Sequence, residues 1–420
     1  MSLPAASTSS TTAPGGPGAA PSAPAEPTLA DLTTLRVGGP VGTYVEAGTE
    51  AELIDAVRAA DDAGRPLLVV GGGSNLLVAD EGFDGVVVHD VRQGLDADLE
   101  DSCGTDGACG GASLSLPAGQ DWDAFVAEAV ANEWVGVEAL SGIPGTVGAA
   151  PVQNIGAYGQ EVAGVVSSVV TWDRATGGRR TFTLSELGFG YRTSLLKRSM
   201  RSGSAGPDGA ADPGAPWYPT PRYVVLTVNL QMRLGSLSAP VGYAELARRL
   251  GVEVGQRAPS ADVRAAVLEL RGGKGMLLEG VGQDGRRAPD HDRWSAGSFF
   301  TNPVLPVERA GGLPADAPRF PVRSATPEST TGPSLGVVDP ALVKTSAAWL
   351  IEHAGFTKGF GLAGEHSPAR LSTRHTLALT NRGGATAADL VALARAVRDG
   401  VREEFDVELE PEPVLVGTAL

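Results

Sequence analysis

One stretch, residues 66–88, constrains the fold of this chain more than any other part of its sequence. It contains two apolar runs, which read as strands, separated by small residues that can turn sharply and donate hydrogen bonds: Gly71, Gly72, Gly73, Ser74 and Asn75. Successive glycines can adopt positive φ, so their N–H groups can converge on an anion, and the serine and asparagine add side-chain donors. The pattern predicts a phosphate-binding loop between two strands. The alternative is a glycine-rich turn that binds nothing.

This loop differs from two common phosphate-binding motifs. The G-x-G-x-x-G motif of dinucleotide-binding proteins opens a helix and requires a third glycine, but Leu76 stands there and a further strand and turn follow. A nucleotide-binding P-loop requires G-K-[ST], which the sequence lacks. The segment therefore favours a pyrophosphate ligand held in some other fold.

Composition limits the class of protein. The chain has 420 residues, 42% of them hydrophobic and 20% charged, enough for a large core and two or three domains. A formal net charge of −16 argues against nucleic acid or an anionic membrane as a partner, because their phosphates would be repelled. No apolar run approaches the roughly 18 residues of a membrane-spanning helix, and we expect a cytoplasmic protein.

A second glycine-rich loop spans residues 141–159. Its small side chains would let a flat ligand lie against the backbone, which makes it the second predicted cofactor loop. The residues assigned to that role are Gly142, Ile143, Pro144, Gly145, Gly148, Asn154, Gly156, Ala157 and Tyr158. A nucleotide sugar or a dinucleotide would satisfy one loop, whereas a ligand with a pyrophosphate and a tricyclic ring would use both.

The remaining pattern alternates helices and strands. A capping box at Thr49 predicts a helix with Leu53, Ile54 and Val57 inward, and a helix capped at Thr386 precedes the final strand. Low-complexity or irregular segments interrupt this pattern at residues 96–112, 199–222 and 305–345, and residues 1–30 read as a disordered, uncleaved tail. The two cysteines, Cys103 and Cys109, lie in the first of these segments and cannot form a disulfide framework or a complete zinc site.

Several motifs, in order along the chain, resemble those of the UDP-N-acetylenolpyruvoylglucosamine reductase family. They are TTLRVGG, VVGGGSNLLV, SGIPGTVGAAPVQNIGAYGQEV, FGYRTSLLK, SAGSFFTNPV and LEPEPVLVG. The resemblance covers residues 31–417 outside the three interruptions. It implies an α+β protein with the FAD-binding fold of the vanillyl-alcohol oxidase / p-cresol methylhydroxylase type.

The resemblance also implies a domain organisation and an activity. Two FAD-binding subdomains would span residues 31–95 and 96–275, the second completed by residues 407–420, and an α/β substrate-binding domain would span residues 276–406. The implied reaction is reduction of UDP-N-acetylglucosamine enolpyruvate to UDP-N-acetylmuramate in peptidoglycan precursor synthesis. NADPH would be the reductant, FAD the non-covalent cofactor, and the protein a monomer.

Three residues carry the implied chemistry. Hydride addition to the enolpyruvyl group leaves negative charge beside a carboxylate, so the site needs a cation and a proton donor. By resemblance Ser298 donates the proton, while Arg192 and Glu412 stabilise the enolate. The resemblance assigns four further residues to the substrate: Tyr191, Tyr243, Lys274 and Asn302.

Two other functions remain open from the sequence. An FAD-linked oxidase of the same fold could act on an alcohol or a lactone, and an inactive module could bind a flavin or a nucleotide sugar. The five histidines have no metal-ligand spacing and none lies in a glycine loop, which argues against a metal site and a covalently attached flavin: His89, His291, His353, His366 and His375.

Overall fold

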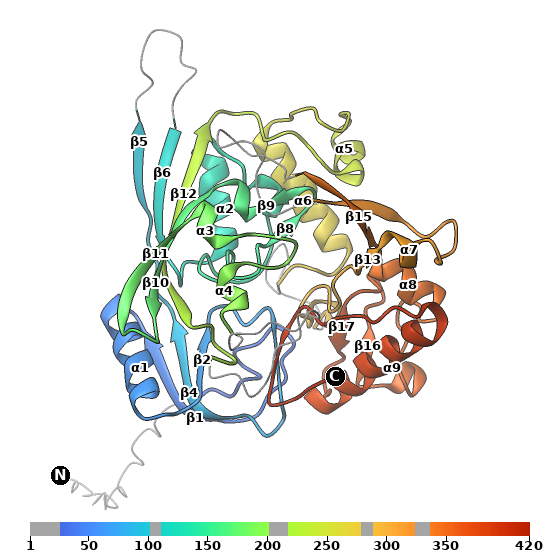
Figure 1. Cartoon of the computed structure of the whole chain (residues 1–420), viewed down its shortest axis with the longest axis horizontal. Helices are drawn as coiled ribbons and strands as arrows, with labels where there is room; N and C mark the ends of the chain where they lie inside the picture. The colour runs from blue at the N-terminus through green and yellow to red at the C-terminus, as the bar shows by residue number, and fades with distance from the viewer. Residues whose placement is uncertain (1–25, 101–110, 201–216, 279–288, 324–336) are drawn as a thin grey trace, which may run out of the picture.

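The computed structural model describes residues 26–100, 111–200, 217–278, 289–323 and 337–420, which form three packed units (Figure 1). The first unit has a parallel sheet in the order β1 (Val41–Ala47), β4 (Phe83–Asp90), β2 (Leu67–Val70), with helix α1 (Glu50–Asp62) packed on it. The predicted capping box at Thr49 is confirmed, and its helix buries the expected apolar residues.

The chain is ordered before residue 31, where the predicted tail was expected to end. Leu29 is fully buried, and its N–H donates a hydrogen bond to the carbonyl of Gly39. This leucine packs among apolar residues of the first unit, so its burial outweighs the low complexity of the sequence around it. Residues 1–25 of the predicted tail lie outside the described residues.

The second unit is built on a mainly antiparallel sheet in the order β11-β10-β12-β6-β5, with β7 (Trp134–Val135) beside β12. Its long strands are β5 (Asp96–Glu100), β6 (Gly111–Pro117), β10 (Val166–Asp173), β11 (Gly178–Thr183) and β12 (Tyr223–Leu234). The short pair is β8 (Gly156–Ala157) and β9 (Gln160–Glu161). The helices are α2 (Trp122–Ala131), α3 (Leu184–Leu187), α4 (Leu195–Arg198), α5 (Ala244–Leu250) and α6 (Ser260–Gly273).

The described ends of the segment 96–112, which the sequence predicted to interrupt the fold, instead belong to two strands of this sheet. Strands β5 and β6 pair in antiparallel register, Asp96 opposite Ser115 and Glu100 opposite Gly111. Alternating burial along β6 explains the strand, because Ala112, Leu114 and Leu116 point into the core. The two cysteines lie in residues 101–110, outside the described part of the chain.

The third unit contains a small sheet, a hairpin and two main helices. The sheet has the order β13 (Val304–Pro306), β15 (Val338–Thr345), β14 (Arg319–Arg323), with α7 (Val307–Ala310) alongside. Strands β16 (Ala369–Leu371) and β17 (Leu379–Asn381) form the hairpin, which packs with α8 (Ala347–His353) and α9 (Ala387–Phe405). The prediction that residues 305–345 form an irregular loop was wrong where they are described. Pro306 ends β13, Pro321 lies in the edge strand β14, and Pro340 falls at a shift of register in β15, so the backbone pairing accommodates all three.

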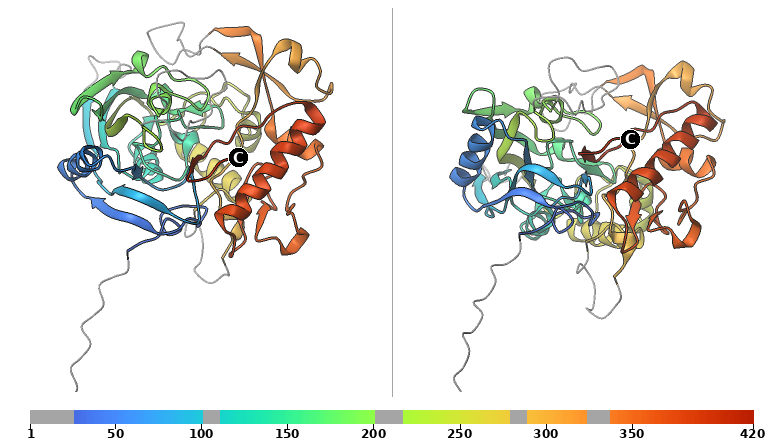
Figure 2. Two further views of the ribbon diagram at one scale, coloured as in Figure 1. Left: turned by 60° about the horizontal axis from the view of Figure 1, so that its bottom comes forward. Right: turned by 90° about the horizontal axis from the view of Figure 1, so that it is seen from below.

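The C-terminal strand returns to the first unit, although the resemblance assigned residues 407–420 to the second FAD-binding subdomain. Strand β18 (Val414–Val416) pairs in parallel with β3 (Leu76–Val78), the strand that follows the first glycine loop. In Figure 2 this segment runs between helix α9 and the other two units. No helix among the described residues is both long and apolar enough to cross a bilayer.

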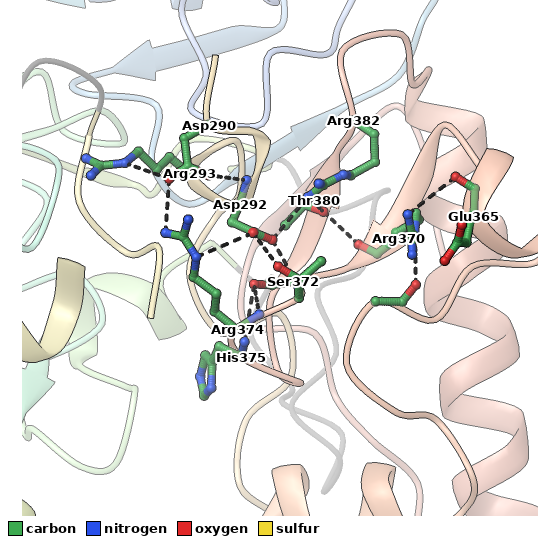
Figure 3. Close-up of polar contacts among 12 residues, drawn as sticks. Asp290, Asp292, Arg293, Glu365, Arg370, Ser372, Arg374, His375, Thr380 and Arg382 are labelled. Atoms are coloured by element: carbon green, nitrogen blue, oxygen red, sulfur yellow. Dashed lines mark hydrogen bonds and ion pairs between the residues drawn. The ribbon is translucent and has the colours of Figure 1, made fainter. Parts of the chain in front are cut away.

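A buried carboxylate ties the third unit together. Asp292 accepts hydrogen bonds from the backbone N–H and hydroxyl of Thr373 at 2.9 and 2.6 Å, and its Oδ1 lies 3.0 Å from Arg382 Nη1 (Figure 3). Burial alone would raise the pKa of Asp292, but these hydrogen bonds and the charge of Arg382 hold the pKa below its usual value. The segment that leads to Ser298 is thereby fixed to the β16–β17 hairpin.

We expect Asp292→Ala to lower the free energy of unfolding by about 1–3 kcal/mol, because the half-buried Arg382 loses its carboxylate partner and the N–H of Thr373 loses its acceptor. Urea titration would measure the loss. The difference in free energy of unfolding between the variant and the unaltered protein should have its full size above about pH 4. It should shrink as the pH falls further, since Asp292 then becomes protonated. Glu269→Gln breaks an ion pair between two exposed side chains and should cost less than about 1 kcal/mol. Equal losses in the two variants would contradict this role for Asp292.

Candidate active site

The two glycine loops face each other at backbone distance. A Cβ atom at Gly71 would lie 2.4 Å from Thr146 Oγ1, and one at Gly72 would lie 2.7 Å from Gly145 Cα. The hydroxyl of Ser74 donates a hydrogen bond of 2.9 Å to the carbonyl of Pro144 in the opposite loop. The small residues are therefore required by the close approach of the loops.

Positive φ explains only part of this loop. Of the three glycines in the first loop, only Gly73 has a positive φ, at +56°. A Cβ atom at Gly73 would also collide with the carbonyl of Leu32. The expectation that all three supply left-handed backbone was wrong for Gly71 and Gly72. Space, rather than backbone conformation, selects glycine at those two positions.

A cleft of about 210 Å³ opens beside the facing loops. It is lined on the loop side by Gly71, Gly72, Gly145 and Thr146. Other parts of its wall come from elements that the sequence did not single out: His89, Asp90, Val91, Gln93, Gly119, Asp121 and Leu278. Since binding sites for whole small molecules usually exceed about 300 Å³, this cleft suits one portion of a larger cofactor.

The other predicted loop residues shape the second loop. Gly142, at φ +70°, donates its N–H to Asp123 Oδ1 at 2.6 Å. A Cβ atom at Gly148 would lie 2.3 Å from the Cβ of Ala118, so only glycine fits there. Ile143 packs on the core of the second unit, and Gly156 and Ala157 form β8. Asn154 is buried, and its side-chain amide donates to Glu161 and to the carbonyl of Gly190.

Arg192 lies in a tight turn between Gly190 and Thr193, which exchange two backbone hydrogen bonds. Its φ is +53°, an uncommon conformation for a non-glycine residue that is often found at functional sites. The guanidinium donates a 2.9 Å hydrogen bond to the carbonyl of Gly156, and its Nε lies 3.1 Å from Glu412 Oε1. That Nε is buried and not aligned for a hydrogen bond, so the pair is held by charge.

Glu412 lies where all three units meet. Its N–H donates to the carbonyl of Phe299 at 2.8 Å, and its own carbonyl accepts from Asn75 Nδ2 at 3.3 Å. Its carboxylate, 12% exposed, accepts from Gln153 Nε2 at 3.3 Å and faces Arg192. No sequence signal pointed to Gln153, which also bonds Asn75 at 2.8 Å.

Ser298 precedes the residue that bonds Glu412. The N–H of Phe299 donates to the carbonyl of Leu377 in the β16–β17 hairpin, and its carbonyl accepts from Glu412. Gly297, at φ +73°, turns the chain just before the serine. The half-buried hydroxyl of Ser298 makes no hydrogen bond with any described residue, so it is available to a ligand.

Tyr191 and Asn302 also come together at this site. The Tyr191 hydroxyl accepts a 3.2 Å hydrogen bond from the backbone N–H of Asn302, and burial raises the pKa of that phenol. The Asn302 side chain, however, accepts a 2.9 Å hydrogen bond from the N–H of Ala347 at the start of α8. The side-chain amide of Asn302 therefore caps the start of α8, in addition to any contact with a ligand.

A second group holds Tyr158, Tyr243 and Lys274. The two tyrosine rings meet edge to face with centroids 5.6 Å apart, and Lys274 Nζ lies 5.5 Å from the Tyr158 centroid. Burial lowers the pKa of Lys274, but a 2.8 Å contact with Glu245 and nearby phenols outweigh it, so the net pKa is raised. Among the described residues no hydrogen bond or ion pair joins Tyr243 or Lys274 to Arg192, Ser298 or Glu412.

Two of the histidines, His89 and His375, are half-buried. His89 Nδ1 lies 2.9 Å from the Tyr44 hydroxyl in the cleft wall, and burial lowers the pKa of this imidazole. Burial of His375 and the cationic side chains beside it together bring its pKa down to about 4. In Figure 3 its ring points away from the Asp292 cluster. No group of His, Cys, Asp and Glu in the described chain could hold a metal ion.

Known protein families match the N-terminal and the C-terminal parts of this chain. Residues 42–176 match the FAD binding domain, and residues 288–416 match the C-terminal domain of UDP-N-acetylenolpyruvoylglucosamine reductase. The reductase of Cutibacterium acnes is 48% identical over 392 residues, which cover 93% of this chain and 90% of that protein. The reductase of Nocardia farcinica is 50% identical, covering 93% and 89% of the two chains.

The chain belongs to the UDP-N-acetylenolpyruvoylglucosamine reductase family. The crystal structure of the Thermus caldophilus reductase agrees, with a TM-score of 0.53, 25% identity and coverage of 93% of this chain and 97% of that one. The predicted family, the α+β class and the FAD-binding fold are therefore confirmed. As a member of this reductase family, the protein is a flavin-dependent oxidoreductase.

The loops of this reductase-family chain fit FAD. The glycines bring backbone, rather than side chains, to the wall of the cleft, which also carries Gln93 and His89. Backbone donors in such a concavity suit the pyrophosphate of FAD. Of the predicted cofactor residues, Gly71, Gly72 and Gly145 line this cleft, whereas Asn75 bonds Gln153 and Glu412, and Tyr158 lies with Tyr243 and Lys274.

We expect Gly72→Ala to lower FAD occupancy at least tenfold, because its methyl group would push the two loops apart. The ratio of flavin absorbance to protein absorbance after purification would measure the loss. Gly164→Ala is the matched control, since a Cβ at Gly164 meets no atom within 4 Å. Full flavin content in Gly72→Ala would show that FAD binds elsewhere.

Proposed function

We propose that this protein reduces UDP-N-acetylglucosamine enolpyruvate to UDP-N-acetylmuramate, with FAD bound at the glycine loops and NADPH as the electron source. The observation that carries the proposal is the Arg192–Glu412 pair, which is bonded through the backbone to the segment that holds Ser298. Family membership supports the same reaction, because the relatives are named as reductases of UDP-N-acetylenolpyruvoylglucosamine.

The side chains of the site suit the two ends of the enolpyruvyl group. Bound FAD, in its reduced form, would supply the hydride for the terminal carbon of the double bond. The Arg192 guanidinium can hold the substrate carboxylate and stabilise the negative charge that develops next to it. Glu412 keeps that guanidinium in place through the 3.1 Å contact with Nε.

Ser298 completes the addition. Its unpartnered hydroxyl is proposed to give a proton to the carbon that carries the carboxylate, so that hydride and proton add across the double bond. Serine is a weak acid, but the acceptor has carbanion character, and the backbone bonds on either side of Phe299 fix the position of the donor.

The second group of residues suits the nucleotide end of the substrate. Lys274 and Tyr243 offer a cation and a neutral donor to the diphosphate. Lys274 already pairs with Glu245, so substrate binding would have to compete with that contact. A cytoplasmic location and a monomeric state accompany the proposal as predictions from the sequence; size-exclusion chromatography would test the second.

The anaerobic visible spectrum tests the proposed function directly. NADPH should bleach the flavin absorbance of the purified protein, and UDP-N-acetylglucosamine enolpyruvate should restore it. Recovery only with oxygen would instead support an oxidase, and a protein that takes up no flavin would support a nucleotide-sugar-binding module.

We expect Ser298→Ala to retain bleaching by NADPH while its rate of reoxidation by the substrate falls by about 10²–10⁴-fold, as for loss of a general acid. Stopped-flow absorbance would separate the two half-reactions. Ser185→Ala, at an exposed serine of α3, should leave both rates unchanged. Normal reoxidation of the Ser298→Ala enzyme would remove Ser298 from the proposed mechanism.

A further inference from the structure

Lys344 lies at the candidate active site, although no sequence motif pointed to it. It belongs to β15 of the third unit, and its Nζ lies 4.5 Å from the centroid of the Tyr191 ring. The guanidinium carbon of Arg192, from the second unit, lies 5.7 Å from the same centroid. Two cations from different units thus lie beside one aromatic ring.

Strand pairing fixes Lys344 relative to the rest of the site. Lys344 is the register partner of Val304 in β13, and the N–H of the next residue, Thr345, donates a 2.9 Å hydrogen bond to the carbonyl of Pro303. Asn302, one residue earlier, bonds the Tyr191 hydroxyl. The lysine and the tyrosine are therefore held from both sides of the interface between the second and third units.

Lys344 has no carboxylate partner in the described chain. No described acidic oxygen lies within 4.0 Å of its Nζ, and Glu161, the carboxylate that acts on the pKa of this lysine, already accepts a 2.8 Å hydrogen bond from Asn154. Burial lowers the pKa of Lys344, Glu161 partly opposes this effect, and Arg192 adds to it. A half-buried ammonium without a counter-charge is costly to maintain, and an arriving anion would relieve that cost.

We propose that Lys344 binds an anionic oxygen of the nucleotide-sugar substrate, acting from the third unit opposite Arg192. This inference rests on the proposed function, which supplies two candidate anions, the enolpyruvyl carboxylate and the diphosphate. Arg192 already faces Glu412 and the carbonyl of Gly156, whereas the Lys344 ammonium meets only the Tyr191 ring among described partners. Substrate binding would place a negative charge between the two units and hold them together.

Substitution of the charge tests the inference. Lys344→Met keeps the length and apolar stem of the side chain but removes the ammonium, and it should raise the dissociation constant of the substrate for the oxidised enzyme about 10- to 100-fold. Lys344→Arg should recover most of the affinity. Flavin content and thermal midpoint should match the unaltered protein, because Met can still pack on Tyr191. Titration followed by the flavin spectrum or by calorimetry would measure binding.

A ligand pair identifies the anion. UDP-N-acetylglucosamine has the diphosphate but not the enolpyruvyl carboxylate, so equal weakening of both ligands by Lys344→Met assigns the lysine to the diphosphate. Weakening of the enolpyruvyl ligand alone assigns it to the carboxylate. Arg309→Gln, which removes an exposed cation of α7 in the same unit, is the control and should change neither constant.

The inference is overturned if Lys344→Met binds both ligands within about twofold of the unaltered protein, which is less than the loss of one hydrogen bond to a charged group. Turnover of the enolpyruvyl substrate by the unaltered protein separates this result from failure of the proposed function. If that protein turns over the substrate while Lys344→Met binds normally, only the role of Lys344 is wrong. If the unaltered protein neither binds nor turns over the substrate, the proposed function is wrong.

Discussion

The structure depends on the way in which residues 410–416 connect its three units. Within this short segment the carbonyl of Glu410 accepts from Thr301, and the N–H of Glu412 donates to Phe299, both in the third unit. The N–H of Val414 then donates to Asn75 in the first glycine loop. The Glu412 side chain faces Arg192 in the second unit. One segment thereby fixes Ser298, Arg192 and the first glycine loop relative to one another.

The glycine loops show a different kind of constraint. Their residues are small because two backbones approach each other, and the donors between them, such as Ser74, bond the opposite loop. A cofactor held in this way is recognised largely by backbone groups, which every residue possesses. At the glycine loops, the shape of the backbone therefore contributes more to ligand binding than the identity of the side chains. Around Arg192, Lys274 and Lys344, charge contributes more.

The proposed substrate end draws charged side chains from the second and third units and from the C-terminal segment. Arg192 lies beside Glu412 and Lys274 beside Glu245, whereas Lys344 contacts an aromatic ring. A paired cation is held in place by its carboxylate, whereas a cation without a carboxylate partner can attract an anionic ligand. These contacts support the proposal that a ligand with two anionic groups, a carboxylate and a diphosphate, bridges the second and third units.

Local sequence determined much of this protein, including the capped helices α1 and α9, the β10–β11 hairpin, the two glycine loops and the motifs that indicate the family. These features follow from periodicity, capping and turn chemistry, which act over a few residues. Only the tertiary structure decided that residues 96–112 and 305–345 contribute strands, since strand pairing depends on partners far along the chain. The same holds for Gln153 and Lys344, whose significance lies in what they meet across an interface. No local pattern records a contact between residues that are hundreds of positions apart.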